Sequence, residues 1–504
     1  MGANIDQAAL APSAPASPPL LAASTASGFL WLMAQSLSGR FATFFSQLIL
    51  AKLLLPEAFG QIGLAYTVTT LVGAFVSFGI DDVLLQRLRR INYWVAPAFI
   101  ISLGLALLGM VVMLAVAPIV ARLYGSTGLV GLLVVLAINL PISALAVVPG
   151  VKLRAAMNFR FLASYASIEI FAIQAASVAL AASGFGAYSF VLPVPAAAAI
   201  RVAVFWWKAP TRLQSRWRRV QFRFLLGSGL LVLGTRLLIE AVNQGDYIVL
   251  GVMATDAVVG MYFFAFRLAA QPVRMLAGNF GSVLFPALVQ LRAEPQRQEA
   301  AVLRVSQLLA YMVTPLCFLQ AAVAAPLLHL MFGVRWDGAI PLIQILSLGL
   351  PGDAVAWIAG ALLVARREFR RDFVYLAATA PPFFLLVIAG AYWGSSLGVA
   401  IGVSLYYATV KPLNSWWVLR HTMRLADFGH IYVWPAVLSA LAIGSVYVAG
   451  NRLWDADRFV PELVLNLILG PSIYLILMQL FVPHVLREVL ARFSLGRLLK
   501  RFGW

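Results

Sequence analysis

Long apolar segments dominate this chain and constrain its fold more than any other feature. A helix needs about 20 mostly apolar residues to cross a bilayer, and fourteen segments of that kind are separated by charged or turn-rich breaks. Only 11% of the residues are charged, against roughly 25% in soluble proteins. The sequence therefore predicts an all-α polytopic membrane protein, and it excludes a soluble enzyme, a secreted disulfide scaffold and a disordered chain.

Two terminal segments flank the fourteen expected spans. Residues 1–27 are rich in Ala, Pro and Ser and contain no Lys or Arg, which predicts a disordered cytoplasmic leader. Residues 483–504 alternate apolar and basic side chains, which predicts a basic amphipathic helix on the anionic inner leaflet. A helix that docks on a partner protein would show the same pattern. The spans are expected near residues 28–51, 61–80, 96–121, 128–149, 160–182, 187–207, 229–251, 261–285, 302–331, 339–364, 372–391, 397–419, 431–449 and 463–482.

The distribution of basic residues predicts the orientation of the chain. With the N-terminus inside, the cytoplasmic loops and the C-terminal tail hold 26 of the 37 Lys and Arg residues, and the opposite side holds 5. Basic loops stay on the cytoplasmic side of a membrane, so both termini are expected there. Topology thus accounts for most of the net charge of +18, and no nucleic-acid partner is needed to explain it.

The two halves of the chain resemble each other, and the offset between matching residues drifts only from 200 to 210. Each match is weak alone, but four in the same order indicate an internal repeat. The matched pairs are Ile49–Tyr66 with Val249–Phe266, Ala117–Gly125 with Ala325–Gly333, Leu140–Arg160 with Leu350–Arg370, and Arg201–Trp207 with Lys411–Trp417.

The repeat predicts two six-helix lobes. Because six is even, both copies enter the membrane in the same direction, and an axis along the membrane normal should relate them. Two such lobes with a cavity between them suggest alternating access around a central site. The expected order is an N-lobe with spans 1–6 (28–207), a basic cytoplasmic linker (208–228), a C-lobe with spans 7–12 (229–419) and two further spans (420–482).

Ten ionisable residues lie within the expected spans, where each costs about 2.5–3.5 kcal/mol to insert and is therefore a functional candidate. Their excess of cations favours an anionic substrate, such as a diphosphate or an acidic sugar, because the planar guanidinium of arginine binds two oxygens at once. The cations, which are the substrate-binding candidates, are Arg40, Arg201, Arg236, Arg267, Arg274 and Lys411. The anions, which are candidates for a coupling ion or for charge pairs, are Glu169, Glu240, Asp246 and Asp353.

Several of these charged residues could instead have purely structural roles. Arg236 and Glu240 are one helical turn apart and could form a purely structural pair. Arg201 and Lys411 lie near tryptophan pairs and could extend to the inner membrane surface, and Arg267 could reach the outer one. Asp246 could simply hydrate a helix end near the outer surface. Arg40 and Arg274 are the deepest cations, and for them a functional role is favoured.

The sequence lacks the usual signatures of catalysis and of metal binding. It contains no GxxxxGK[ST] phosphate loop and no G-x-S-x-G nucleophile elbow. The four histidines, His329, His421, His430 and His484, have no metal-ligand spacing. A single cysteine, Cys317, allows no disulfide within the chain. We therefore expect a protein that is not an enzyme and that has no metal or cofactor, although H⁺ or Na⁺ could be coupled to its action.

Several helix-end motifs resemble those of the polysaccharide-export flippases (Wzx-like) in the multidrug/oligosaccharidyl-lipid/polysaccharide exporter superfamily. Leu48–Gly60 (LILAKLLLPEAFG) is similar to the first-span signature of that family. The resemblance covers roughly residues 28–420, and spans 13–14 match the longer, fourteen-span members. The second-half signatures are Asp246–Tyr262 (DYIVLGVMATDAVVGMY), Leu284–Pro286 (LFP), Phe332–Trp336 (FGVRW) and Pro341–Leu346 (PLIQIL).

The resemblance implies a flippase that moves a lipid-linked oligosaccharide repeat unit, carried on undecaprenyl diphosphate, across the bacterial cytoplasmic membrane. The unit would then enter exopolysaccharide, capsule or O-antigen, and a polysaccharide polymerase is a conceivable partner. In that family, spans 1, 2, 7 and 8 commonly line a cationic cavity. Three alternatives stay open: a multidrug or small-cation antiporter of the same superfamily, a membrane-bound glycan-modifying enzyme, and a non-transporting scaffold.

Overall fold

The computed structural model describes residues 38–77, 91–156, 158–211, 219–453 and 459–493. Within these ranges the chain is mostly helical, with short turns between the helices, and has no strand. The predicted leader, 1–27, and the last part of the predicted tail, 494–504, lie outside the described residues.

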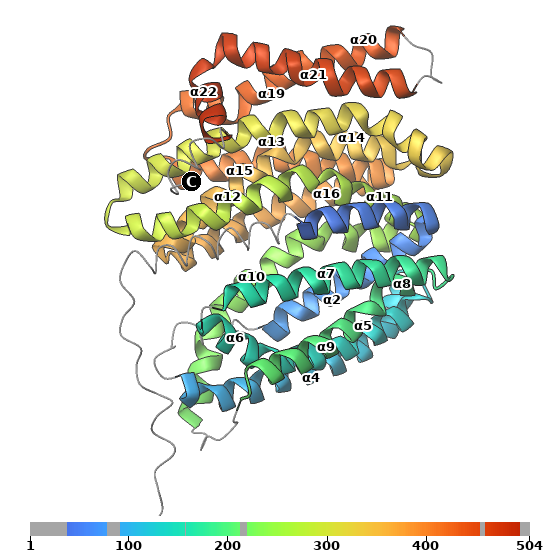
Figure 1. Cartoon of the computed structure of the whole chain (residues 1–504), viewed down its shortest axis with the longest axis vertical. Coiled ribbons are helices and arrows are strands. Elements are labelled where there is room, and N and C mark those ends of the chain that lie inside the picture. The colour runs from blue at the N-terminus through green and yellow to red at the C-terminus, as the bar shows by residue number, and fades with distance from the viewer. Residues whose placement is uncertain (1–37, 78–90, 157, 212–218, 454–458, 494–504) are drawn as a thin grey trace, which may run out of the picture.

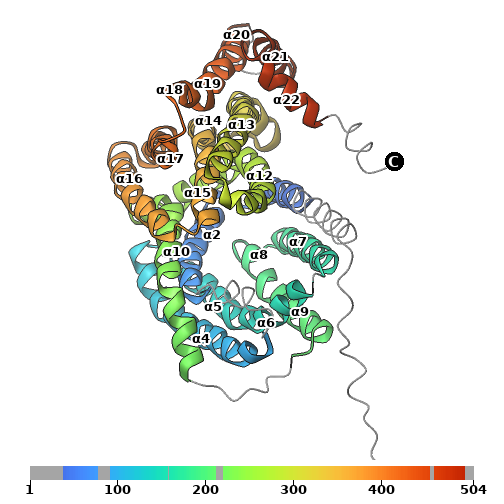
Figure 2. The same cartoon turned by 90° about the vertical axis from the view of Figure 1, so that its left-hand side faces the viewer.

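The N-terminal half of the chain forms one group of helices, in the lower part of Figures 1 and 2. Its first helix is described over residues 38–53. The elements that follow are α2 (Pro56–Ser77), α4 (Ile91–Leu123), α5 (Leu129–Leu145), α6 (Val147–Ala155), α7 (Phe159–Ala182), α8 (Tyr188–Val191) and α9 (Pro193–Lys208).

The second group, the C-lobe, begins with a long helix, α10 (Arg219–Met253). The basic linker predicted over 208–228 is therefore helical from Arg219 onward. A helix can run beyond the apolar part of its sequence because its backbone hydrogen bonds do not depend on apolar side chains. The remaining elements are α11 (Asp256–Ala269), α12 (Gln271–Gln290), η2 (Leu291–Ala293), α13 (Pro295–Phe332), η3 (Gly333–Trp336), α14 (Ala339–Gly349), α15 (Pro351–Arg366), α16 (Phe369–Leu405), the π-helix η4 (Tyr406–Val410) and α17 (Lys411–Leu419).

The last helices form a layer on the side of the C-lobe that faces away from the N-lobe (Figures 1 and 2). The Tyr474 hydroxyl donates to the Tyr311 carbonyl at 2.9 Å, and Arg304 pairs with Glu488 at 2.7 Å. These contacts join the layer to α13. Its elements are α18 (Leu425–Phe428), η5 (Gly429–Val433), α19 (Trp434–Ser439), η6 (Ala440–Gly444), α20 (Ser445–Leu453), α21 (Phe459–Phe481) and α22 (Pro483–Phe493).

Eight helices in the described chain are long and apolar enough to cross a membrane, or ten when two bent pairs are each counted as one span. The fold class is thus confirmed, while fourteen spans stay a prediction. The apolar segment Phe369–Leu419 shows one reason for the lower count. It reverses direction at Gly394 and Ser395, where Ser395 has φ +51°, and so holds both spans predicted at 372–391 and 397–419.

Both lobes contain a bent span at related places in the repeat. The helix pair α5 and α6 is bent by 41°, and so is the pair α14 and α15. In the second copy the break directly precedes Pro351, which lacks the backbone N–H that would continue the helix. The shared bend supports the repeat inferred from the sequence.

The two lobes meet along α2 and α11, where two glycines related by the repeat touch. A Cβ atom on Gly60 would lie 1.9 Å from the carbonyl oxygen of Asp256, and a Cβ atom on Gly260 would lie 1.8 Å from that of Pro56. The two contacts exchange when 200 is added to or subtracted from each number, as expected for a two-fold interface. We call the end of the molecule where α2 and α11 begin the closed end.

This contact leads to a stability prediction. Gly60→Ala places a methyl group against backbone that cannot rotate away, so we expect a loss of about 1–3 kcal/mol in stability, as for an overpacked core. The measurement is the thermal unfolding midpoint of the purified protein in detergent. Gly73→Ala, on the same helix but with nothing within 4 Å of its Cβ position, is the matched control. Equal midpoints for the two variants would contradict the close backbone contact.

Candidate functional site

Two of the six candidate cations form ion pairs inside their own lobes. In the N-lobe, Arg201 on α9 donates from Nη1 to Glu169 Oε1 on α7 at 3.0 Å, and from Nη2 to Ser143 Oγ on α5 at 3.2 Å. In the C-lobe, Lys411 on α17 lies 3.1 Å from Asp353 on α15. Glu169 and Asp353 therefore pair with these two cations and not with Arg40 or Arg274.

The repeat relates these two ion pairs. Arg201 corresponds to Lys411, and Ser143 corresponds to Asp353, both at an offset of 210. Each cation therefore reaches the same position on the neighbouring helix, but an acid stands there only in the C-lobe. The N-lobe supplies its acid from Glu169, on a third helix. Both cations are thus compensated within their lobes, which makes them poor candidates for binding a mobile substrate.

Aromatic rings surround the C-lobe pair more closely than the sequence indicated. The Lys411 ammonium lies 5.8 Å from the ring centroids of both Tyr406 and Tyr407, within the range of a cation–π contact. These tyrosines begin the π-helical turn that directly precedes Lys411. A Cβ atom on Gly352 would lie 2.0 Å from the Tyr407 carbonyl oxygen, so α15 approaches this turn at backbone distance.

Three arginines gather where the helix over residues 38–53 meets the C-lobe. A Cβ atom on Gly278 of α12 would lie 2.7 Å from Arg40 Nη2, so the guanidinium rests on that helix. Arg274 is one turn away on α12 and is exposed, and the positive charges of Arg40 and Arg274 interact. Arg267, on α11, lies over the Phe263 ring at 5.2 Å. We call Arg40, Arg267 and Arg274 the arginine cluster.

The helix α10 contributes the remaining candidates at the interface between the lobes. Arg236 and Glu240 are both half-buried on it, but the described ion pairs do not include one between them. Of the ten candidates, the arginine cluster, Arg236, Glu240 and Asp246 form no ion pair that is described within one lobe, and all six lie on the helix over residues 38–53, α10, α11 and α12. The cationic excess predicted from all ten residues thus lies on the helices that join the lobes.

Asp246 is buried, with only 2% of its surface exposed. The Tyr262 hydroxyl donates to its Oδ2 at 2.8 Å, and the Tyr247 backbone N–H donates to its Oδ1 at 2.9 Å. The suggestion that Asp246 hydrates a helix end near the surface is therefore wrong. Sequence reasoning missed Tyr262, although it lies in the same quoted motif. The 16-residue separation hid the contact, because it depends on how α11 folds back onto α10.

An apolar groove lies on some of the helices that carry the arginine cluster, although none of the three arginines lines it. Its volume is about 200 Å³, and it lies between the helix over residues 38–53, α11, α13, α14 and α21. Phe44 and Leu268 line it; Phe44 is one turn from Arg40, and Leu268 follows Arg267 directly. Gln320 also lines the groove and donates to the Leu268 carbonyl at 2.7 Å. The same helices thus carry arginines and an apolar groove side by side.

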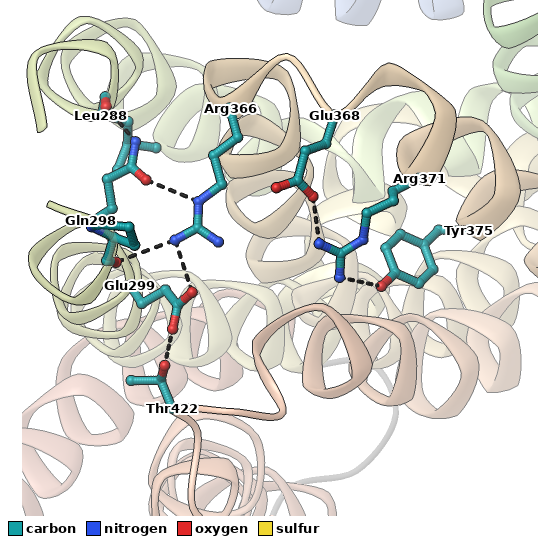
Figure 3. A network of polar contacts seen from close by, with 9 residues as sticks. Leu288, Gln298, Glu299, Arg366, Glu368, Arg371, Tyr375 and Thr422 are labelled. Atoms are coloured by element: carbon teal, nitrogen blue, oxygen red, sulfur yellow. Dashed lines mark hydrogen bonds and ion pairs between the residues drawn. The ribbon is translucent and has the colours of Figure 1, made fainter. Parts of the chain in front are cut away.

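A second polar network lies away from the interface, among α13, α15 and the segment before α18 (Figure 3). Arg366 donates from Nε to Gln298 Oε1 at 2.9 Å and from Nη2 to Glu299 Oε1 at 2.8 Å. The Thr422 hydroxyl donates to the other Glu299 oxygen. The network is internal to the C-lobe and its C-terminal layer, so we assign it a structural role. Among the described residues, no group of three or more His, Cys, Asp or Glu side chains is arranged to hold a metal ion.

Comparison with known proteins identifies relatives of this chain. Residues 49–341 match the family described as "Polysaccharide biosynthesis protein". The succinoglycan biosynthesis transport protein ExoT of Rhizobium meliloti is 25% identical over 454 residues, which cover 88% of this chain and 90% of that protein.

Solved structures share the fold. The lipid II flippase MurJ, in an inward closed conformation, superposes with a TM-score of 0.69 at 13% identity over 93% of this chain and 99% of that one. An inward-facing multidrug resistance MATE transporter of the MOP superfamily gives 0.54 at 17% identity over 79% of this chain and 96% of that one. At these identities the likeness concerns the fold alone.

The related ion pairs lead to a rescue prediction. Glu169→Gln leaves Arg201 without its carboxylate, and we expect a loss of about 1.5–3 kcal/mol, as for other hydrogen bonds to charged groups. Adding Ser143→Asp should restore most of the stability, because it places an acid where the C-lobe has Asp353. The measurement is the thermal unfolding midpoint. Ser143→Asn, neutral and equal in size, is the control; rescue by both substitutions would show that the charge is not responsible.

Proposed function

The chain belongs to the polysaccharide biosynthesis protein family, and from this membership we propose that it moves a lipid-linked oligosaccharide across the cytoplasmic membrane. The observation that carries the proposal is the apolar groove beside the arginine cluster. A lipid diphosphate has an anionic head next to a long apolar tail. Helices that present arginines and an apolar groove within one turn of each other match both parts.

The arginine cluster is the proposed binding site for the diphosphate. Arg40 and Arg274 come from the two lobes, so an anion between them would contact both. Each guanidinium group can bind two phosphate oxygens. The negative charge of the diphosphate would also reduce the repulsion between the two arginines. The oligosaccharide would occupy a cationic cavity between the lobes, and the part of the carrier tail nearest the diphosphate would lie in the groove lined by Phe44, Leu268 and Leu467.

Movement would follow alternating access about the two-fold axis. With the orientation expected from the positive-inside pattern, the closed end would lie at the outer face of the membrane, and substrate would enter from the inner leaflet. Release at the outer face would require the lobes to separate at Gly60 and Gly260. Rigid movement of one repeat against the other is the usual means in transporters built from repeats.

We propose that Asp246 couples this movement to a gradient of H⁺ or Na⁺. Two of the four candidate carboxylates, Glu169 and Asp353, pair with cations of their own lobes. Asp246 is instead buried within the C-lobe, and only neutral hydrogen-bond donors are described around it. A buried carboxylate without a cationic partner is the type of group that takes up a proton or a metal cation. Glu240 is the second candidate.

Lipid analysis tests the proposed function. Deletion of the gene should cause lipid-linked repeat units to accumulate on the cytoplasmic face, and Arg40→Ala and Arg274→Ala should reproduce that accumulation at normal protein levels. Arg370→Ala removes an exposed arginine at the start of α16 and should leave export normal. No accumulation in the deletion strain would refute the flippase. Accumulation in the deletion strain alone, with normal export by both variants, would refute the arginine site.

The coupling prediction concerns Asp246→Asn. We expect the transport rate in membrane vesicles to fall roughly tenfold, within the usual range of a coupling free energy. The remaining transport should not depend on the proton or sodium gradient. Tyr262→Phe keeps the carboxylate and should retain gradient dependence. Wild-type transport that continues unchanged after collapse of both the proton and the sodium gradient would exclude coupling.

A further inference from the structure

Two short loops cross the interface at the closed end in opposite directions. One joins α4 to α5 over residues 124–128, and the other joins α13 to α14 over residues 333–338. They occupy equivalent places in the repeat, since each ends on a glycine, Gly128 or Gly338, that directly precedes the next helix, and these two glycines are 210 residues apart. Each loop leaves its own lobe and contacts the other one, but the two make different kinds of contact.

The C-lobe loop inserts an aromatic side chain. Trp336 is fully buried, with 0% exposure, and its Nε1–H donates to the Ala51 carbonyl of the N-lobe at 3.0 Å. Its ring centroid lies 5.2 Å from that of Phe59 on α2 and 4.3 Å from that of Phe264 on α11. Arg335 adds a hydrogen bond to the Lys52 carbonyl at 3.3 Å. The indole therefore packs between the lobes and bonds to the backbone of the first span.

The N-lobe loop makes a polar contact instead. The Ser126 hydroxyl donates to Asp256 Oδ2 at 2.7 Å, and the Gln61 amide donates to the same oxygen at 3.2 Å. Asp256 is the first residue of α11, so a C-lobe carboxylate accepts two hydrogen bonds from the N-lobe. A further cross-lobe bond, from Thr67 to Gln244 at 3.2 Å, lies deeper along α2.

We infer that these two loops form an outer seal with unequal halves: an aromatic wedge, Trp336, and a polar latch made by Ser126, Gln61 and Asp256. Both must release before the lobes can separate at the closed end. The wedge holds the seal more strongly, because withdrawing it would expose an indole and two phenyl rings and break a buried hydrogen bond. When the latch opens, its polar groups form hydrogen bonds with water instead, so its release costs less free energy than withdrawal of the wedge.

The inference rests on the proposed function only for the direction in which the seal faces. Its test uses thiol labelling rather than transport, so the two can fail separately. Ala51→Cys places a reporter under the wedge, at a residue with 0% exposure. A membrane-impermeant maleimide is added to intact cells, and the labelling rate is measured by mass shift.

We expect slow labelling of the reporter in the otherwise native chain and labelling about tenfold faster with Trp336→Ala, because the open state becomes more populated. Trp336→Phe should restore most of the protection, and Ser126→Ala should accelerate labelling less than Trp336→Ala. Trp393→Ala is the matched control, since it removes a tryptophan that is 90% exposed. Unchanged labelling in Trp336→Ala, or equal acceleration by the Trp393 control, would overturn the inference.

The native cysteine separates opening from unfolding. Cys317 is fully buried on α13, with 0% exposure, and should stay unlabelled when only the seal opens. Labelling of Cys317 in Trp336→Ala without the reporter would mean that the C-lobe core itself is disrupted. The test then uses Trp336→Phe with the Ala51→Cys reporter. The inference holds if this reporter labels faster than in the native chain and slower than in Trp336→Ala, and fails otherwise. If labelling responds as expected but no lipid-linked unit accumulates in the deletion strain, the seal is upheld and the flippase is refuted.

Discussion

The backbone contact between Gly60 and Gly260 fixes how the two halves of this protein meet. Helices at that distance tolerate no side chain at either position, so both lobes are held at one point on their common axis. The crossing loops, the aromatic packing around Trp336 and the hydrogen bonds to Asp256 all lie close to that point. The arginine cluster lies further from the closed end, where one cross-lobe hydrogen bond, from Thr67 to Gln244, is described. One steric requirement thus separates a sealed end from a region that is able to hold substrate.

The cost of charge in a membrane explains how the ionisable residues are distributed. Arg201 and Lys411 are neutralised by carboxylates of their own lobes, which move with them as rigid bodies. The arginine cluster is arranged differently, because Arg40 and Arg274 bring like charges together from two lobes. Like charges that approach across a movable boundary favour an anion between them. The same arrangement links binding to the relative position of the lobes.

Much of this arrangement could be predicted from the sequence because it depends on residue type and spacing. Apolar runs indicated the helical class, and the repeat indicated which residues occupy equivalent places, including Gly60 with Gly260 and Arg201 with Lys411. Contacts between helices could not be predicted in the same way. The partner of Arg201 is Glu169 on a third helix, and Asp246 is buried because Tyr262 folds back onto it. Helix α10 begins at Arg219, ten residues before the apolar segment predicted over 229–251, since a helix continues past its apolar segment when its backbone remains bonded.

The differences between the repeats carry more functional information than their similarities. A perfect two-fold molecule would have two equal loops at the closed end and equal charges on both sides of the axis, so its two lobes would be chemically identical. Here the loop positions Ser126 and Trp336 differ in chemistry, and Arg40 corresponds to Glu240 at an offset of 200. The backbone keeps the symmetry that rigid lobe movement requires, whereas the side chains break it. In the proposed transport cycle, a cation on one side of the axis and an acid on the other would allow substrate and coupling ion to bind at separate places while both respond to the same movement.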